Sequence, residues 1–514
     1  AGCAVRQPAP VEDIRMLSQD AGMYLALIKG PIFDPARQAA YFQQFKDRFF
    51  KPWHRTGPKH SAEIVFSGLK KYRLKSLYGE NNLPLPPDFL DSMARQSQPG
   101  TYPMRHQPAI TVAHASIRVL PTHKPVFFGP LHPGRGFPFD MMQNSLVPAG
   151  TPVLVTHESK DRLWALVETD WVAGWVRRQQ IAAVDEAFMA DYSAHPLAGF
   201  TADQVPVIPE NSPPVFSGRV GMALPMKGPA SDTGFVTVLA PARNPLGNAE
   251  LLEAGVPEQG IQRLPFSATP DNFADLLNAL MGQTYGWGGL YENRDCSALI
   301  QDVFAGFGLP LPRNSKDQAD FGENISLKKL SGPEKQSLIR TQGVPLQTLL
   351  YMPGHIMLYL GVDPASDQPV ICHAMWGVTT RPPLSTRSGR LVVGRTVITT
   401  LEPGKEQFPL VQPEDLLVEK LTRMVLLRGR TMPTWQPPSG GDWPDGISSV
   451  HRRCPPGCLP NTLLRRLHHC LQDSPPGGFA LGADAFGHEM DRSLDGTDAH
   501  VRPAQRRAAW GDRQ

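Results

Sequence analysis

Cysteine is scarce in this chain, with 6 among 514 residues. Cys3, Cys296 and Cys372 are the cysteines of the first 450 residues, and the other three lie near the end. Three widely separated thiols cannot form the disulfide framework of a small secreted domain. Any chemistry that needs a thiol therefore has few places to occur.

A strong excess of one charge and a long apolar run are also missing. The 51 Lys+Arg and 48 Asp+Glu residues leave a net charge of +3, which gives no electrostatic reason to expect a nucleic-acid partner. No apolar run approaches the roughly 18 residues that would suggest a membrane-spanning helix. The 41% hydrophobic and 19% charged residues are enough for packed cores, and the length predicts about three or four domains.

The hydrophobic periodicity divides the chain into five parts. Residues 1–108 read as helices and loops, with helical spacing in the two stretches "VEDIRMLSQDAGMYLALI" and "DPARQAAYFQQFKDRFFKPWH". Residues 109–190 and 191–268 carry short alternating runs separated by Gly, Pro and Asp, which indicate two small β-barrels. Residues 269–430 read as helices followed by antiparallel strands, an α+β domain. Residues 431–514 lose this patterning and are expected to be a disordered tail.

Each end of the chain raises an alternative. The opening "AGCAVRQPAP" begins with Ala-Gly-Cys, the residues with which the recognition box of a bacterial lipoprotein signal ends. Cys3 is therefore a candidate lipid anchor; the alternative is a chain that simply begins there. The tail invites a zinc site, but its spacing fits no compact zinc module, and we expect no metal there. The tail residues in question are Cys454, Cys458, His468, His469 and Cys470.

The stretch "NRDCSALI" places Cys296 where a helix of about residues 296–307 is expected to begin. Apolar Ala298, Leu299, Val303 and Phe304 form the stripe of that helix. A thiol in the first turn meets free backbone N–H groups and the positive end of the helix dipole, both of which favour a thiolate. Such a nucleophile still needs a base.

Two histidines in "PGHIMLYLGVDPASDQPVICHAMWG" are the candidates for that base. If this segment is a hairpin centred near Pro364, His355 and His373 lie directly opposite each other on one sheet face and Cys372 lies on the other. The three side chains then have the nucleophile, base and orienting roles of a catalytic triad. The alternatives are a buried cysteine with two structural histidines, or three zinc ligands with a fourth close by.

At this point the sequence resembles the NlpC/P60 family of cell-wall cysteine peptidases. The blocks that carry the resemblance are "TYGWGGLYENRDCSALIQDVFAGFGLPLPRNSKDQA", "PGHIMLYLG" and "VICHAMWG", in the family order Cys, His, His. Upstream, "FDMMQNSLVPAGTPVLVTHESKDRLWALVETDWVAGWV" resembles the bacterial SH3 domain of a subset of these enzymes, and "YFQQFKDRFFKPW" resembles their helical N-terminal segment. The resemblance implies a multidomain fold: a helical segment, two SH3-like barrels and an α+β papain-like catalytic domain.

The resemblance also implies an activity, a γ-D-glutamyl-L-diamino acid endopeptidase that cuts peptidoglycan stem peptides. Cys296 would be the nucleophile, His355 the general base and His373 the orienting residue. Asp295 resembles the residue that pairs with the free amine of the stem's L-Ala; a carboxylate beside a thiolate is costly unless a cation arrives. The N–H groups of Cys296 and Ser297 would stabilise the oxyanion. The other expected substrate-binding residues are Tyr285, Trp287, Arg313 and Ser315.

The resemblance further implies where the protein acts and with which partners, and it leaves two alternative functions open. We expect a monomer that acts on muropeptides outside the cytoplasm, without nucleic acid, metal or organic cofactor. In such relatives the first SH3 domain narrows the substrate cleft, and here a long insertion at 121–149 lies beside it. An amidase or acyltransferase on the same core is the alternative activity. A cell-wall-binding protein without catalysis is the alternative of a different class.

Overall fold

The computed structural model describes residues 11–427, apart from 131–132, 231–233 and 382–387. The candidate anchor Cys3 and the tail at 431–514, with its zinc alternative, lie outside the described residues. None of the helices in the described part combines the length and the apolar character that crossing a bilayer requires.

The N-terminal segment is helical, as expected, but only one of its two periodic stretches forms a long helix. In α3 (Pro35–Phe50), Asp34 caps the first turn by accepting a hydrogen bond from the Arg37 N–H (3.1 Å). The stretch 11–28 instead breaks into α1 (Asp13–Met16) and α2 (Gly22–Leu25), because polar side chains between them bind backbone groups. The segment continues through η1 (Lys51–His54), α4 (Ala62–Val65), α5 (Ser67–Lys71) and α6 (Phe89–Ser97).

The first β-domain is a seven-stranded antiparallel sheet with its own core. Alternating apolar side chains such as Ile117, Val153 and Val167 are fully buried in it. Its strands are β1 (Gln107–Thr111), β2 (Ala115–Arg118), β3 (Gln143–Val147), β4 (Pro152–Glu158), β5 (Trp164–Glu168), β6 (Ala173–Arg177) and β7 (Ile181–Ala183), in the order β3-β2-β6-β5-β4-β1-β7.

The second β-domain repeats the topology of the first. Its order is β10-β9-β13-β12-β11-β8-β14, and subtracting seven from each label gives the order of the first sheet. In both domains a short 3-10 helix, η3 (Arg178–Gln180) or η4 (Glu258–Gly260), precedes the last strand. The repeat supports the prediction of two barrels of one kind. After α7 (Glu186–Ala194), its strands are β8 (Leu197–Phe200), β9 (Val205–Pro209), β10 (Phe216–Gly218), β11 (Ala223–Ala230), β12 (Phe235–Arg243), β13 (Ala249–Pro257) and β14 (Ile261–Arg263).

The third domain is α+β, as the sequence predicts. Its helices are α8 (Pro270–Leu280), η5 (Trp287–Glu292), α9 (Cys296–Gly306), α10 (Ser315–Ala319), α11 (Gly332–Gln342), η6 (Lys405–Gln407), η7 (Pro413–Asp415) and α12 (Leu417–Lys420). Its strands are β15 (Glu323–Ser326), β16 (Thr348–Met352), β17 (His355–Val362), β18 (Pro369–Thr380), β19 (Gly389–Thr400) and β20 (Arg423–Leu426), in the order β15-β20-β16-β17-β18-β19.

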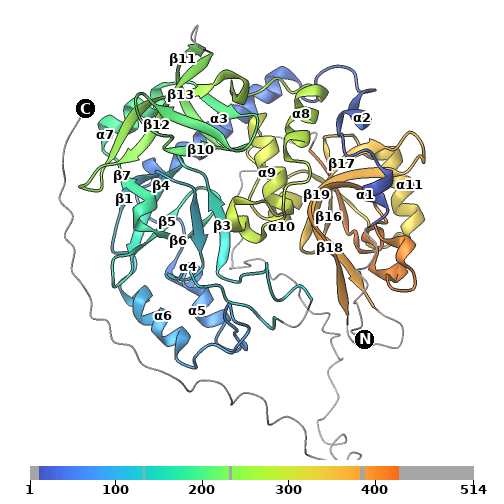
Figure 1. The fold of residues 1–514 in the computed structure, drawn as a ribbon, viewed down its shortest axis with the longest axis horizontal. Helices are drawn as coiled ribbons and strands as arrows, with labels where there is room; N and C mark the ends of the chain where they lie inside the picture. Colours follow the sequence, from blue (N-terminus) through green and yellow to red (C-terminus); the bar gives the residue numbers. More distant parts are fainter. Residues whose placement is uncertain (1–10, 131–132, 231–233, 382–387, 428–514) are drawn as a thin grey trace, which may run out of the picture. The chain divides into compact units, whose positions relative to one another are not determined.

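Two apolar layers cover the faces of this sheet. Figure 1 shows α8 and α9 on one side and α11 on the other, and separate clusters of buried side chains fill the two spaces. Helix α8 is capped by Thr269, which accepts the hydrogen bond from the Asn272 N–H (3.3 Å), and Pro270 takes the first helical position.

The N-terminal segment covers the edge strand β19 of the third domain. The Gln19 side chain donates to the carbonyl of Ile398 (3.0 Å) and accepts from its N–H (2.9 Å), as a neighbouring strand would. Further along, Asp13 accepts from the Thr400 N–H and hydroxyl, both at 2.7 Å. The amide side chain thus satisfies backbone groups that an open sheet edge leaves unpaired.

A buried ion pair organises the insertion between β2 and β3. Arg118 donates to Asp140 (2.7 Å) and to Gln143 (2.8 Å), and both members of the ion pair are almost fully buried. Asp140 also accepts from the N–H groups of Val126 and Met142, each at 2.9 Å. The base of the insertion is therefore fixed by charge-assisted hydrogen bonds.

We expect Asp140→Ala to destabilise the first β-domain by about 3 to 5 kcal/mol, because it leaves the Arg118 guanidinium buried without its partner. The midpoint of urea unfolding, followed by the fluorescence of Trp164 and Trp175 in this domain, measures the effect. The control is Glu253→Gln, which removes an exposed pair with Lys227 and should cost below about 1 kcal/mol. Equal midpoints for the two variants would contradict the prediction.

Candidate active site

The turn before α9 holds Cys296 at the start of that helix, as the sequence predicts. Asp295 is the N-cap: its backbone is extended, and its Oδ1 accepts from the Ala298 N–H at 2.8 Å. Cys296 is therefore the first helical residue, and its side chain is 6% exposed. The thiol lies at a helix N-terminus inside a nearly dry environment.

The two histidines lie on the same face of neighbouring strands and contact each other. The Nε2 of His355 and the Nδ1 of His373 are 2.8 Å apart. The prediction that they lie directly opposite was wrong: Leu358 pairs with Cys372, so His355 is a diagonal neighbour of His373. The turn spans 363–368 instead of centring on Pro364. The strand pairing is therefore shifted by two residues from the predicted register, and a shift of two keeps both histidine side chains on one face.

A third strand extends this contact into a chain of hydrogen bonds. The Nε2 of His373 lies 3.1 Å from the hydroxyl of Thr399 on β19, and that hydroxyl donates to the Thr400 carbonyl (2.8 Å). Because the single hydroxyl proton is used there, His373 must donate through Nε2 and accept at Nδ1. His355 then donates through Nε2, which leaves its Nδ1 as a proton acceptor. Thr399 thus selects the tautomer of His355 that a general base requires.

The helix and the sheet bring the nucleophile to the start of β17. The N–H of Ile356, the residue after His355, faces the sulfur of Cys296 and favours its anionic form, as does the N–H of Ser297. The carboxylate of Asp295 acts electrostatically on both Cys296 and His355. The structure therefore assembles Cys296, His355 and His373 at one place.

Burial keeps both members of the predicted nucleophile and base pair neutral. Burial, and then the charge of Asp295, raises the pKa of the Cys296 thiol to about 12. Burial lowers the pKa of His355 to about 4, against the opposing effect of Asp295, and lowers that of His373 well below its usual value. The thiolate expected from the helix terminus alone is not the favoured form in this environment, so thiol and neutral imidazole form the resting pair.

The cation beside Asp295 is a side chain of the same chain, Arg313. Its two terminal nitrogens donate to the two carboxylate oxygens at 3.0 and 2.7 Å, and the pair is buried. The Gly288 N–H, the Ser297 hydroxyl and the Ala298 N–H also donate to this carboxylate. Burial would raise the pKa of Asp295, but Arg313 and these donors hold it below its usual value. The carboxylate predicted to await a substrate amine already has five donors.

Two glycines of the "YGWGG" motif allow the first β-domain to approach this turn. A Cβ on Gly288 would lie 2.5 Å from the carbonyl oxygen of Gln143, and one on Gly289 would lie 2.5 Å from the Cβ of Leu146. Both glycines have positive φ angles, 58° and 83°. The Gln143 side chain donates to the Gly288 carbonyl (2.9 Å), and Ser145 accepts from the Nε of Arg313 (2.9 Å). Strand β3 is thus part of the support of the site.

Aromatic side chains from the insertion and the third domain pack together beside the nucleophile. The ring of Phe139 lies 5.3 Å from that of Trp287, 5.7 Å from Trp376 and 6.4 Å from Tyr285, between ring centres. Burial raises the pKa of Tyr285 well above its usual value, and the neighbouring Cys296 and Asp295 add to this. The insertion therefore contributes Phe139 to the aromatic wall of the site.

Ser315, the remaining residue predicted to bind substrate, is not among the residues placed above around Cys296. Ser315 begins α10, two residues after Arg313, and is half-buried. Sequence reasoning missed four residues of the site: Phe139, Ser145, Trp376 and Thr399. The first three lie within the blocks quoted for the resemblance but were given no role, and Thr399 lies outside those blocks. In the part of the chain that the structure describes, no group of three or more His, Cys, Asp or Glu side chains is arranged to hold a metal ion.

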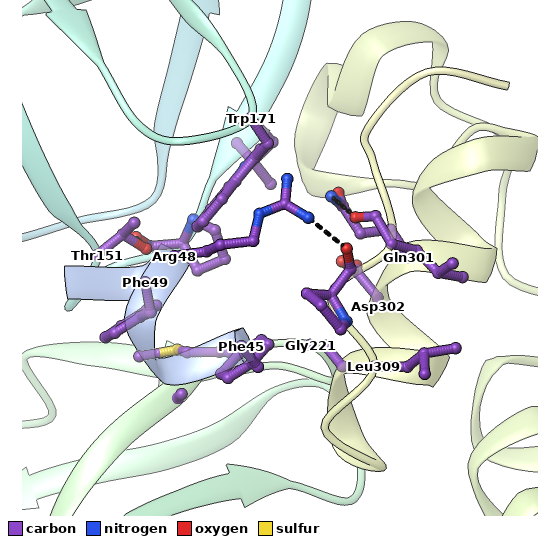
Figure 2. A pocket seen from close by; sticks show the side chains of 16 residues that line it. Phe45, Arg48, Phe49, Thr151, Trp171, Gly221, Gln301, Asp302 and Leu309 are labelled. Carbon is purple, nitrogen blue, oxygen red and sulfur yellow. Dashed lines mark hydrogen bonds between the residues drawn. The ribbon is translucent and has the colours of Figure 1, made fainter. Parts of the chain in front are cut away.

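A separate pocket lies where α3, both β-domains and α9 meet. It has a volume of about 650 Å³ with open solvent included, and none of Cys296, His355 and His373 lines it. Figure 2 shows Arg48 reaching across it, where its guanidinium donates to the Pro310 carbonyl (2.6 Å). Its other walls are mainly apolar. The chemistry of the cysteine site does not involve this pocket.

Comparisons with known proteins identify three regions of the chain. Residues 282–379 match the model of the NlpC/P60 family, residues 125–177 an SH3 domain (SH3b1 type), and residues 1–102 the N-terminal NLPC_P60 stabilising domain. None of the functionally curated proteins compared with the chain matches it.

Two solved structures illustrate the structural similarity. An NlpC/P60 endopeptidase from Photobacterium damselae subsp. piscicida is 25% identical, with a TM-score of 0.72 over 80% of this chain and 97% of that one. An NlpC/P60 family protein from Bacillus cereus is 17% identical, with a TM-score of 0.38 over 57% of this chain and 83% of that one. The first similarity extends over nearly the whole of the known structure, so it includes the arrangement of the domains as well as the catalytic fold.

We expect Thr399→Val to lower kcat/KM by about 10- to 100-fold, as loss of an outer hydrogen-bond partner commonly does. Without the hydroxyl acceptor, His373 can carry its proton on Nδ1, which turns the Nδ1 of His355 into a donor that cannot deprotonate Cys296. Steady-state kinetics on the substrate proposed below measure the loss. Thr399→Ser keeps the hydroxyl and should keep the activity; a valine variant as active as the serine variant would show that this hydrogen bond has no such role.

The pH profile should reflect the two neutral groups. Because the pKa of His355 is lowered to about 4, the imidazole remains a proton acceptor as the pH falls until about 4, and activity is lost only below that pH. Because the pKa of Cys296 is raised to about 12, no alkaline loss from premature thiol ionisation is expected near neutrality. The dependence of kcat/KM on pH tests this, since an unshifted histidine would give an acidic limb near about 6.5.

Proposed function

Because the chain carries an NlpC/P60 domain at residues 282–379, we propose that it is a cysteine endopeptidase of peptidoglycan stem peptides. The bond we propose is the one between the γ-carboxyl of D-Glu and the diamino acid. Three contacts carry the proposal: that of Cys296 with the start of β17, that of His355 with His373, and that of His373 with Thr399.

The first step is acylation of the thiol. His355 takes the Sγ proton of Cys296 at Nδ1 as the sulfur attacks the γ-carbonyl carbon of D-Glu, because both groups are neutral at rest. The negative charge passes to the carbonyl oxygen, which the N–H groups at the start of α9 stabilise. His373 accepts from the Nε2–H of the imidazolium that forms and so supports it, as the orienting member of a triad does.

The second step releases the amine and regenerates the thiol. His355 gives its proton to the nitrogen of the diamino acid as the C–N bond breaks, leaving a thioester between Cys296 and the γ-carboxyl. Water then attacks the thioester carbonyl while His355 takes a proton from it, and the C–S bond breaks. The proton returns to the sulfur, so the products are the two peptide fragments.

The proposal includes stems with a free N-terminal L-Ala and an action outside the cytoplasm. In the free protein the carboxylate of Asp295 already accepts hydrogen bonds from its donors, two of them from Arg313. It would therefore bind the substrate amine only after Arg313 shifts. We also propose that the aromatic wall formed by Phe139 and Trp287, whose ring centres lie 5.3 Å apart, restricts the site to short peptides and disfavours a cross-linked polymer.

We expect the protein to release L-Ala-D-Glu from L-Ala-γ-D-Glu-diaminopimelate, as detected by mass spectrometry. Cys296→Ser should lower the rate by about a thousandfold or more, because a hydroxyl is far less acidic than a thiol and the pKa of His355 is not matched to a hydroxyl. The Cys372→Ser variant is the matched control and should keep the activity, since the Cys372 side chain points to the opposite face of β18 from His373 and packs in the apolar core.

A tripeptide that stays intact would contradict the proposed bond. Full activity of Cys296→Ser would contradict the assigned nucleophile whatever the substrate. N-acetylation of the L-Ala tests whether the free amine is recognised. An unchanged rate with the acetylated peptide would show that it is not.

A further inference from the structure

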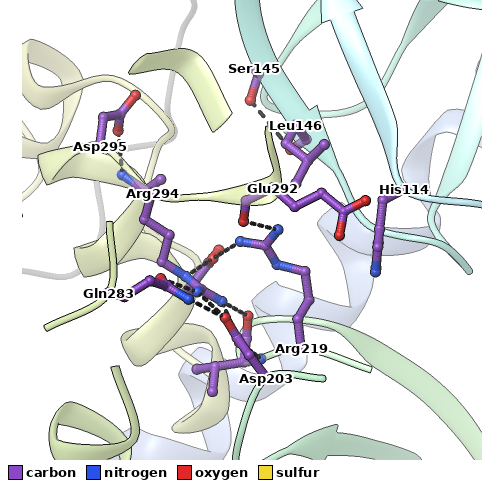
Figure 3. A network of polar contacts seen from close by, with 12 residues as sticks. His114, Ser145, Leu146, Asp203, Arg219, Gln283, Glu292, Arg294 and Asp295 are labelled. Atoms are coloured by element: carbon purple, nitrogen blue, oxygen red, sulfur yellow. Dashed lines mark hydrogen bonds and ion pairs between the residues drawn. The ribbon is translucent and has the colours of Figure 1, made fainter. Parts of the chain in front are cut away.

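Arg294, two residues before the nucleophile, has every one of its donors occupied in a buried network. Its side chain is 1% exposed, and Figure 3 shows it between Asp203 and Gln283. The Nε donates to Asp302 (2.7 Å), Nη1 to Asp203 (2.6 Å) and Gln283 (2.7 Å), and Nη2 to Asp203 (2.9 Å) and the Val220 carbonyl (2.9 Å). A guanidinium has five N–H groups, and all five are used.

The acceptors of Arg294 come from two different domains. Asp203 and Val220 belong to the second β-domain, in the loops before β9 and after β10, whereas Gln283 and Asp302 belong to the third domain. Arg219 of the second β-domain makes a parallel link: it donates to the Glu292 carbonyl (2.8 Å) and lies 3.4 Å from Asp302. The turn that leads into α9 is therefore held by the second β-domain.

The backbone of Arg294 transmits this attachment to the catalytic residues. Its carbonyl accepts from the Gly286 N–H (2.9 Å), and it forms a β-bridge with Tyr285, whose ring lies close to Cys296. The next residue is the N-cap Asp295, and the one after it is the nucleophile. A bidentate carboxylate–guanidinium pair fixes orientation as well as distance, so a change at Asp203 moves the start of the helix.

We propose that Asp203 is a positioning residue for Cys296: through its bidentate bond with Arg294, the second β-domain places the thiol against the His355 base. This domain then has a part in the reaction without touching the substrate. The inference rests on the proposed function only for the substrate of the kinetic assay, because the placement of the thiol can be measured without any substrate.

The test uses Asp203→Asn in the full chain, which preserves shape and removes the carboxylate. We expect kcat to fall by about 10- to 100-fold, the effect of a small misplacement of a reacting group, with KM changed by less than about threefold. The second measurement is the rate of Cys296 alkylation by iodoacetamide at neutral pH, taken from time profiles followed by peptide mass spectrometry. The rate should fall about tenfold or more, because a displaced thiol can no longer pass its proton to the neutral His355 as the sulfur attacks the reagent.

The matched control is Glu253→Gln in the same β-domain, whose exposed pair with Lys227 lies outside the network and whose kinetics should equal those of the wild type. If Asp203→Asn does not fold, Gln283→Leu removes a neutral acceptor from Arg294 without stranding the charge, and the same two measurements should move in the same directions.

Wild-type kcat and a wild-type alkylation rate in a folded Asp203→Asn protein would overturn the proposal, even with a lower melting temperature. Asp203 would then contribute to stability and not to the position of the thiol. If the wild type fails to cut the tripeptide, the proposed function fails. The alkylation profiles of the two proteins then still decide whether Asp203 positions the thiol.

Discussion

The buried pair of Asp295 and Arg313 is the interaction on which the rest of the site depends. A helix that begins with a cysteine needs a cap, and the cap here is a carboxylate placed next to the thiol. In a dry environment that charge opposes ionisation of the sulfur, and it would itself be protonated without a cation. Arg313 supplies the cation, and Ser145 holds Arg313 from the first β-domain. Cys296 thus follows a charge pair of the third domain that a hydroxyl of the first β-domain helps to hold.

Two consecutive residues before the nucleophile connect to different β-domains. Asp295 reaches the first through Arg313 and Ser145, and Arg294 reaches the second through Asp203. Buried guanidinium groups are costly to leave without partners, so the two contacts hold the domains and the catalytic turn in one arrangement. Both β-domains are therefore structural parts of the candidate active site.

Local sequence patterns predicted the elements that carry the site, and distant contacts account for what they missed. The start of α9 and the strand at 355–362 follow from capping and alternation, which depend on neighbours in the chain. The register of the hairpin depends on how the turn at 363–368 closes, and the motif did not reveal this. Arg313 was predicted to lie in the site, but its bond to Asp295 was not predicted. The hydroxyl of Thr399 and the ring of Phe139 come from distant segments that reach the site only in the folded chain. From the sequence alone, without knowledge of the residues that they contact, such residues cannot be distinguished from ordinary surface or core positions.

The edge of the catalytic sheet has a consequence for how the protein is made. Gln19 and Asp13 bind Ile398 and Thr400, which lie 379 and 387 residues further along the chain. These hydrogen bonds can form only after nearly all of the described chain has been synthesised. Covering the edge of this sheet is therefore a late step of folding.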